Sequence, residues 1–123
     1  MSATILLVED EPNNRELAET ILVKSGFRTV CAENGADAIR LACDSCPDLI
    51  LMDLSLPVID GWEAIRKIRA QDALKEVPIV ALTAHAMRGD REKAIASGAD
   101  DYLAKPYRFG ELLAVVHKHL GLR

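Results

Sequence analysis

Two apolar runs in this sequence end on carboxylates. The run ILLV at 5–8 is followed by three acids at 9–11, and the run LILM at 49–52 is followed by Asp53. Two carboxylates about 4 Å apart repel by about 4 kcal/mol at an effective dielectric constant of about 20. Such a cluster therefore requires a proton or a cation. Oxygen ligands favour a hard divalent ion, and Mg²⁺ suits the site because it binds through few carboxylates and keeps several waters.

A hydroxyl and a lysine follow two further apolar stretches. Thr83 comes after the run at 79–82, and Lys105 comes just after the short stretch at 102–104. Together with Mg²⁺, these groups make a receptor for a phosphoryl group, in which one carboxylate acts as the nucleophile and the cations stabilise the transferring oxygens. Taken singly, Asp10 is more typical of a helix N-cap, and Thr83 and Lys105 of ordinary surface residues. The site is predicted by their joint occurrence.

The elements that position these residues alternate along the chain. Short apolar runs predict strands, and segments between them carry apolar residues at helical spacing. The expected strands are 4–8, 27–32, 48–53, 77–82 and 100–104. Gly26 and Gly98 each stand where a helix should end before the next strand. Strict alternation favours a parallel sheet covered by helices on both faces, a doubly wound three-layer α/β fold, with ligands bound outside the carboxyl ends of the strands.

Composition limits the classes of partner. The chain has 123 residues, half of them hydrophobic, which is enough for one domain with its own core. The formal net charge of −4 gives no reason to expect direct binding to nucleic acid or to anionic membranes. No signal peptide is recognisable, and no apolar run approaches the length of a membrane span. We therefore expect a cytoplasmic protein.

Cys43 and Cys46 form a CxxC motif in a chain with an odd number of cysteines. The motif could be a redox pair or half of a zinc site. However, it closes a predicted helix instead of opening one, and no second CxxC or nearby histidine completes a zinc set. Because both cysteines share helical spacing with Ile39 and Ala42, we expect them to pack in the core as small hydrophobic residues.

Four segments resemble one known family when they are taken together. They are VEDE at 8–11, LILMDLSLPVIDG at 49–61, VALTA at 80–84 and YLAKP at 102–106. In order and spacing they resemble the receiver domain of two-component response regulators, and the resemblance covers essentially the whole chain. It implies a flavodoxin-like receiver fold with five parallel strands in the order 2-1-3-4-5.

The resemblance also implies a role for each acid. Asp53 would be the phosphoacceptor, which forms an aspartyl phosphate with a phosphoryl group from a partner histidine. Asp10 and Asp53 would bind Mg²⁺ directly, helped by the main-chain carbonyl of Ser55, while Glu9 would act mainly through water. Mn²⁺ can substitute for Mg²⁺ at such a site. The first acidic position is often Asp in this family, so that Glu9 is a small departure.

The remaining family positions concern the phosphoryl oxygens and the switch. By the same resemblance, Lys105 would hold one phosphoryl oxygen and Thr83 would donate a hydrogen bond to another. Tyr102 matches the aromatic switch position, which turns inward as Thr83 moves. The Lys105–Pro106 peptide bond would be cis, although cis accounts for only about 5–6% of X–Pro bonds in general.

Ser55 and His85 stand two residues beyond Asp53 and Thr83, where receivers tune hydrolysis of the acyl phosphate. We expect substitution of both to change the phosphoryl lifetime more than the phosphorylation yield. An exposed loop histidine without any such role is an equally good interpretation of His85.

The stretch at 83–106 most resembles phosphorelay receivers, both those of hybrid histidine kinases and single-domain regulators of the DivK type. The chain ends directly after the last helical stripe, so we expect a single receiver domain over 1–123 without an output domain, either as a stand-alone regulator or as an excised domain. The partners would be a sensor histidine kinase or a histidine phosphotransfer protein, and a downstream protein that binds the face around Tyr102 and the helices on either side of it. That face is expected to hold Arg88, Arg91, Tyr107 and Arg108.

Three other functions remain open at this point. A degenerate receiver would serve only as a protein-binding scaffold, but the complete set of Asp10, Asp53, Thr83 and Lys105 argues against it. A metal-dependent aspartyl phosphatase would need a second acid where this chain has Ser55. A nucleotide-binding module would need a glycine-rich phosphate loop, which the sequence lacks. We expect no turnover of an external substrate.

Overall fold

The computed structural model describes residues 3–54, 61–83 and 90–121. Its elements are β1 (Thr4–Val8), α1 (Pro12–Lys24), β2 (Arg28–Ala32), α2 (Gly35–Ser45), β3 (Leu49–Asp53), α3 (Gly61–Arg69), the short 3₁₀ helix η1 (Asp72–Leu74), β4 (Ile79–Thr83), α4 (Asp90–Ala96), β5 (Asp101–Ala104) and α5 (Phe109–Leu120). The strands form one parallel sheet in the order β2-β1-β3-β4-β5. The predicted fold class and strand order are confirmed, and the strands lie within two residues of their expected bounds.

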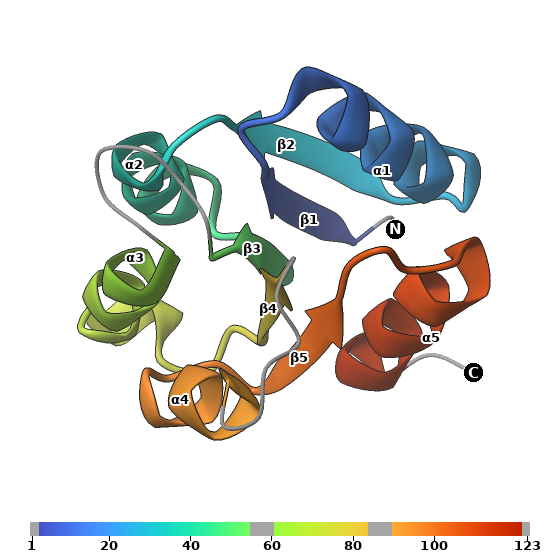
Figure 1. Cartoon of the computed structure of the whole chain (residues 1–123). Coiled ribbons are helices and arrows are strands. Elements are labelled where there is room, and N and C mark those ends of the chain that lie inside the picture. The colour runs from blue at the N-terminus through green and yellow to red at the C-terminus, as the bar shows by residue number, and fades with distance from the viewer. Residues whose placement is uncertain (1–2, 55–60, 84–89, 122–123) are drawn as a thin grey trace.

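Helices cover both faces of the sheet (Figure 1). Helices α1 and α5 lie on one face, and α2, α3 and α4 lie on the other. Successive residues of each strand point to opposite faces, so that Ile5 and Leu7 pack with α1 and α5, whereas Leu6 and Val8 pack with α2 and α3. Because both faces are buried, β3 and β4 are apolar at every position up to their last residues, Asp53 and Thr83.

Arg69, at the end of α3, binds the two segments that lead into β4 and β5. Its Nε donates to the Gly98 carbonyl at 2.8 Å, and its Nη1 donates to the carbonyls of Leu74 and Val77 at 2.9 and 2.6 Å. Its Nη2 pairs with Asp100. The guanidinium therefore holds the segment around η1 and the turn before β5 against the same helix.

The expected core packing of Cys43 and Cys46 is wrong, because both side chains are exposed. Helix α2 turns Ala38 and Ala42 toward the core, and Cys43, one residue further, is rotated by about 100° away from them. Cys46 leaves the helix with a positive φ of 45°, so that its side chain no longer follows the helical direction. Cys31, in β2, is partly buried.

Among the described residues, no helix is both long enough and apolar enough to cross a membrane.

Candidate functional site

The register of the sheet places Glu9 beside Asp53 at the carboxyl ends of β1 and β3. Val8 pairs with Met52, so the next residue of each strand, Glu9 and Asp53, stands just beyond the last pair. The backbone N–H of Glu9 donates to the Ala32 carbonyl at 3.0 Å, which carries the sheet pattern one residue past β1. The site is therefore anchored on strand ends and not on a long loop.

Asp10 completes a cluster of three carboxylates. One oxygen from each of Glu9, Asp10 and Asp53 lies within 4.8 Å of the other two. Helix α1 does not use Asp10 as its N-cap, because the Glu11 carboxylate accepts the first backbone N–H groups, including that of Asn14 at 2.7 Å. The exposed Asp10 thus belongs to the cluster.

Lys105 lies between two of these acids. Its Nζ is 2.5 Å from Glu9 Oε1 and 3.0 Å from Asp53 Oδ2. Its backbone N–H donates to the Thr83 carbonyl at 2.7 Å, which ties the turn after β5 to the end of β4. Residues from β1, β3, β4 and β5 therefore meet at one edge of the sheet, as the sequence predicted.

Burial makes the charge of this cluster unusual. Glu9 is only 2% exposed and Asp53 only 3%. Burial raises the pKa of Glu9 to about 7, the neighbouring Asp53 adds to the rise, and Lys105 opposes it. Burial lowers the pKa of Lys105, but hydrogen bonds to Glu9 and Asp53 outweigh this effect, so that its pKa lies above the usual value. The lysine therefore remains protonated at neutral pH.

The donor set fits a hard divalent cation. Glu9 Oε2 is buried and accepts no hydrogen bond from any described residue, which is costly for a carboxylate oxygen. Oxygens on opposite sides of an octahedral Mg²⁺ are about 4 Å apart, and the three carboxylates already lie within 4.8 Å of one another. A cation bound there would offset the charge that the single ammonium of Lys105 leaves uncompensated.

Thr83 and Tyr102, the two predicted switch residues, lie on the neighbouring strands β4 and β5. Leu82 pairs with Asp53, so Thr83, the last residue of β4 and 4% exposed, stands one residue past the acid. Tyr102 pairs with Ala81 and packs, partly buried, against the cluster on the α2 and α3 side of the sheet. The Lys105–Pro106 peptide bond is cis, as expected.

Several predicted residues cannot be placed beside these. Ser55, His85 and Arg88 lie outside the described residues, and the side chain of Arg91 in α4 is not described. Tyr107 was expected on the face formed by Tyr102 and the helices on either side of it, and its place on that face stays a prediction. The side chain of Tyr107 is partly buried and packs against the cluster beneath α1 and α5.

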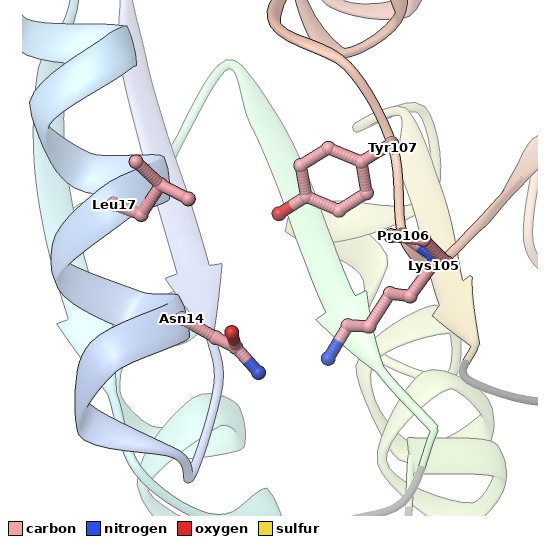
Figure 2. Close-up of a pocket in the computed structure, with 5 residues that line it drawn as sticks. All are labelled: Asn14, Leu17, Lys105, Pro106 and Tyr107. Carbon is pink, nitrogen blue, oxygen red and sulfur yellow. The ribbon is translucent and has the colours of Figure 1, made fainter.

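Sequence reasoning missed a pocket beside Lys105 (Figure 2). Its volume is about 380 Å³, and it is lined by Asn14, Leu17, Lys105, Pro106 and Tyr107. Figure 2 shows the Tyr107 ring and the Lys105 side chain facing α1 across this space. Burial raises the pKa of the Tyr107 hydroxyl, so it stays protonated at neutral pH.

The apolar surface continues from this pocket along α1 and α5. A second pocket of about 220 Å³ is lined in part by Leu17, Ile21, Phe109 and Leu113. Leu17 is 52% exposed and Phe109 is 59% exposed. Leu17 shares helical spacing with the buried Ala18, Ile21 and Leu22 of α1, but spacing alone could not show that Leu17 lies at the solvent edge of this apolar stripe.

The family follows from comparison with known sequences. The sequence profile of the response regulator receiver domain matches residues 5–117. The chain belongs to this receiver family. Among curated relatives, the polar-differentiation response regulator DivK of Brucella anthropi is 35% identical over 121 residues, which cover 98% of each chain.

Solved receiver structures agree with this one over nearly its full length. The receiver domain of a Pseudomonas aeruginosa sensor histidine kinase is 45% identical, with a TM-score of 0.92 over 98% of this chain and 99% of that one. It was solved with a magnesium ion coordinated in its active-site cleft. A putative response regulator from Chloroflexus aurantiacus is 31% identical, with a TM-score of 0.94 and the same coverage. This receiver thus has close relatives among two-component signalling proteins.

Proposed function

We propose that Asp53 accepts a phosphoryl group from a phosphohistidine of a partner protein and holds it as an aspartyl phosphate. The observation that carries this proposal is the position of the Asp53 carboxylate, which is 3% exposed at the carboxyl edge of the sheet. It lies 3.0 Å from the Lys105 ammonium and within the three-carboxylate cluster. Membership of the receiver family supports the same role.

The transfer needs one nucleophile and positive charge around the phosphoryl group. An oxygen of Asp53 attacks phosphorus, while the bond from phosphorus to the donor imidazole breaks and its electron pair returns to the ring nitrogen. Lys105 moves from its present pairing with Asp53 toward a phosphoryl oxygen and stabilises the charge there. The Thr83 hydroxyl donates a hydrogen bond to another oxygen.

Asp10 and Asp53 would hold the divalent cation directly and Glu9 mainly through water. By the family resemblance, the main-chain carbonyl of Ser55, which lies outside the described residues, would be a further ligand. Mg²⁺ is the expected ion and Mn²⁺ its substitute, because both favour oxygen ligands. When bound, the ion supplies positive charge against the carboxylates and the phosphoryl oxygens. The magnesium ion in the related kinase receiver supports this assignment.

The phosphodonor is a sensor histidine kinase or a histidine phosphotransfer protein. Such a donor must bring a histidine to the edge of the sheet, and the pocket beside Lys105 opens there. The exposed Leu17 and Phe109 extend that pocket into an apolar surface on which a helix of the donor can pack. We infer that the donor binds over α1 and the start of α5.

The response to phosphorylation is a rearrangement of the face around Tyr102, away from the surface of α1 and α5 that binds the donor. As Thr83 turns toward the phosphoryl group, Tyr102 moves inward, and a downstream protein recognises the face around Tyr102. Ser55 and His85 set the lifetime of the acyl phosphate. Receivers typically are not turnover enzymes, and we expect no hydrolysis of an external phosphoester.

The decisive experiment is intact mass measurement after incubation with a small-molecule phosphodonor, with and without Mg²⁺. We expect the mass of one phosphoryl group to be gained only with Mg²⁺, and no gain in Asp53→Asn. The matched control is Asp72→Asn, which changes an exposed carboxylate on η1 and should phosphorylate normally.

Absence of any gain in the wild type would overturn the phosphoacceptor role and leave a scaffold that binds proteins through the same surfaces. Gain in Asp53→Asn equal to that of the wild type would move the acceptor to another residue. Steady release of phosphate from a phosphoester substrate would favour a phosphatase.

A further inference from the structure

We propose that Cys43 and Cys46 are a thiol pair that closes reversibly into a disulfide by exchange with small-molecule disulfides. Both side chains are exposed at the end of α2, outside the core that the sequence predicted for them. The pair is a modification site of its own, because Cys46 lies just before β3 while Asp53 ends that strand. The proposal therefore does not depend on phosphoryl transfer.

Helical geometry brings the two Cα atoms within range. Residues three apart in a helix have Cα atoms about 5 Å apart, inside the range of roughly 4.4–6.8 Å that disulfides require. Their Cβ atoms in a regular helix are about 5–6 Å apart, which exceeds the roughly 3.5–4.5 Å of a disulfide. A CxxC pair inside a regular helix would therefore remain open.

Cys46 departs from the regular helix, so the Cβ separation of a regular helix does not apply to this pair. Its φ of 45° turns its side chain out of the helical direction. Its Sγ lies 3.7 Å from the carbonyl oxygen of Cys43, so the thiol is folded back over the turn that carries its partner. Cys43 is exposed, so its side chain is free to rotate toward Cys46 without meeting a packed neighbour in the core.

The segment between Cys46 and β3 is held in place by hydrogen bonds that do not involve the cysteines. The Asp48 carboxylate accepts the backbone N–H of Thr4 at 2.8 Å, and the Asp48 N–H donates to the Thr4 carbonyl at 2.8 Å. These bonds fix the entry into β3 against β1. A disulfide between Cys43 and Cys46 therefore constrains only the last turn of α2.

Cys31 provides an internal contrast. Its Sγ donates to Glu19 Oε2 at 3.1 Å in a partly buried site on β2. Burial raises the pKa of this thiol to about 12, and Glu19 adds to the rise. Because the thiolate is the species that attacks a disulfide, Cys31 is expected to remain reduced while the exposed pair reacts.

The reaction balances with one small-molecule disulfide as the oxidant. One thiolate of the pair attacks a sulfur of oxidised glutathione, forms a mixed disulfide and releases one glutathione thiolate. The second thiolate attacks the protein sulfur of that mixed disulfide and releases the other glutathione. The two cysteines lose two electrons and two protons, and the oxidant gains the electrons as two reduced thiols.

The test treats the folded full chain with excess oxidised glutathione, blocks the remaining thiols with iodoacetamide and maps the peptides by mass. We expect the peptide that contains Cys43 and Cys46 to lose two hydrogens, to carry no label and to recover both thiols after reduction. Cys31 should be labelled only after the chain is unfolded.

Two single variants keep the outcome interpretable. Cys43→Ser and Cys46→Ser should each stop at a mixed disulfide with glutathione, whereas Cys31→Ser should close the disulfide as the wild type does. Stable glutathione adducts on both exposed cysteines of the wild type would overturn the proposal. Covalent dimers, or a disulfide that includes Cys31, would overturn it as well.

Discussion

Gly61 shows how one residue without a side chain sets the geometry of the acidic site. A Cβ at this position would lie 2.3 Å from the carbonyl oxygen of Asp53 and 2.5 Å from the Cα of Leu54. The Gly61 N–H also donates to the Leu54 carbonyl at 3.2 Å. The start of α3 therefore rests directly on the end of β3, and only glycine permits this contact.

We predict that Gly61→Ala displaces the end of β3 and with it Asp53. The chain should lose about 1–3 kcal/mol of unfolding free energy, which is typical of overpacking. Its rate of phosphorylation by a small-molecule donor should fall at least tenfold if the carboxylate moves by about 1 Å. Chemical denaturation and the time course of intact mass measure the two effects.

Gly110→Ala is the matched control, because a Cβ at that position of α5 meets no atom within 4 Å. It should be neutral or stabilising by up to about 1 kcal/mol, since alanine favours a helix. Equal behaviour of the two variants would mean that the contact between Gly61 and β3 has no role in positioning Asp53.

At the scale of elements, the starts of β4 and β5 depend on one partly buried guanidinium. Arg69 is 18% exposed in its side chain and donates to backbone carbonyls on both sides of β4, while Asp100 supplies the opposite charge. Asp100 also accepts the backbone N–H of Ile79 at 2.9 Å, at the start of β4. The side chains of Arg69 and Asp100 thereby link the end of α3 to the starts of β4 and β5.

Arg69→Ala should lower the free energy of unfolding by about 2–4 kcal/mol, because it leaves several carbonyls and one carboxylate without their partner. Thermal or urea denaturation measures the loss. Arg66→Ala removes an exposed arginine from the same helix and should change stability by no more than about 0.5 kcal/mol. A loss in Arg69→Ala no larger than that of the control would contradict the role assigned to this guanidinium.

At the scale of the whole molecule, Asp101 couples stability to pH. It lies on β5, and its Oδ2 is 2.8 Å from His119 Nε2 and 3.4 Å from Lys118 Nζ, both on α5. Burial raises the pKa of Asp101, but hydrogen bonds from His119 and from the Tyr102 backbone N–H, helped by Lys118, outweigh it and lower the pKa below 3.8. The ionised carboxylate is therefore the form that the fold favours.

The sign of the pH dependence follows from that lowered pKa. The contribution of Asp101 to stability is complete above the ordinary pKa of about 4 and is lost as the pH falls through its lower value in the fold. Asp101→Asn should be about 1 kcal/mol less stable than the wild type at pH 7, a typical cost for a lost charged hydrogen bond. The difference should shrink below about pH 4, as measured by urea denaturation across this range.

The control is Asp72→Asn, whose carboxylate is 92% exposed in its side chain and which should match the wild type at every pH. A difference between Asp101→Asn and the wild type that stays constant from pH 7 to the acid limit would show that shape, and not charge, is lost at this position.

The sequence alone determined that the acids, the hydroxyl and the lysine share one edge of a parallel sheet. In a parallel sheet the carboxyl ends of all strands lie at the same edge, so that knowing where each strand ends was enough to gather Glu9, Asp53, Thr83 and Lys105. The strand order needed more than periodicity, since alternating elements are compatible with several orders, and the family resemblance supplied it.

Only the tertiary structure decided whether a residue at the edge of an apolar stripe is buried or exposed. Cys43 and Leu17 lie at the edges of apolar stripes, so a modest rotation of the helix decides whether each side chain is in the core or in solvent. The contact of Gly61 with Asp53 likewise joins segments whose approach no local pattern encodes. Such positions depend on how whole elements pack against one another, and that packing is a property of the assembled sheet and helices.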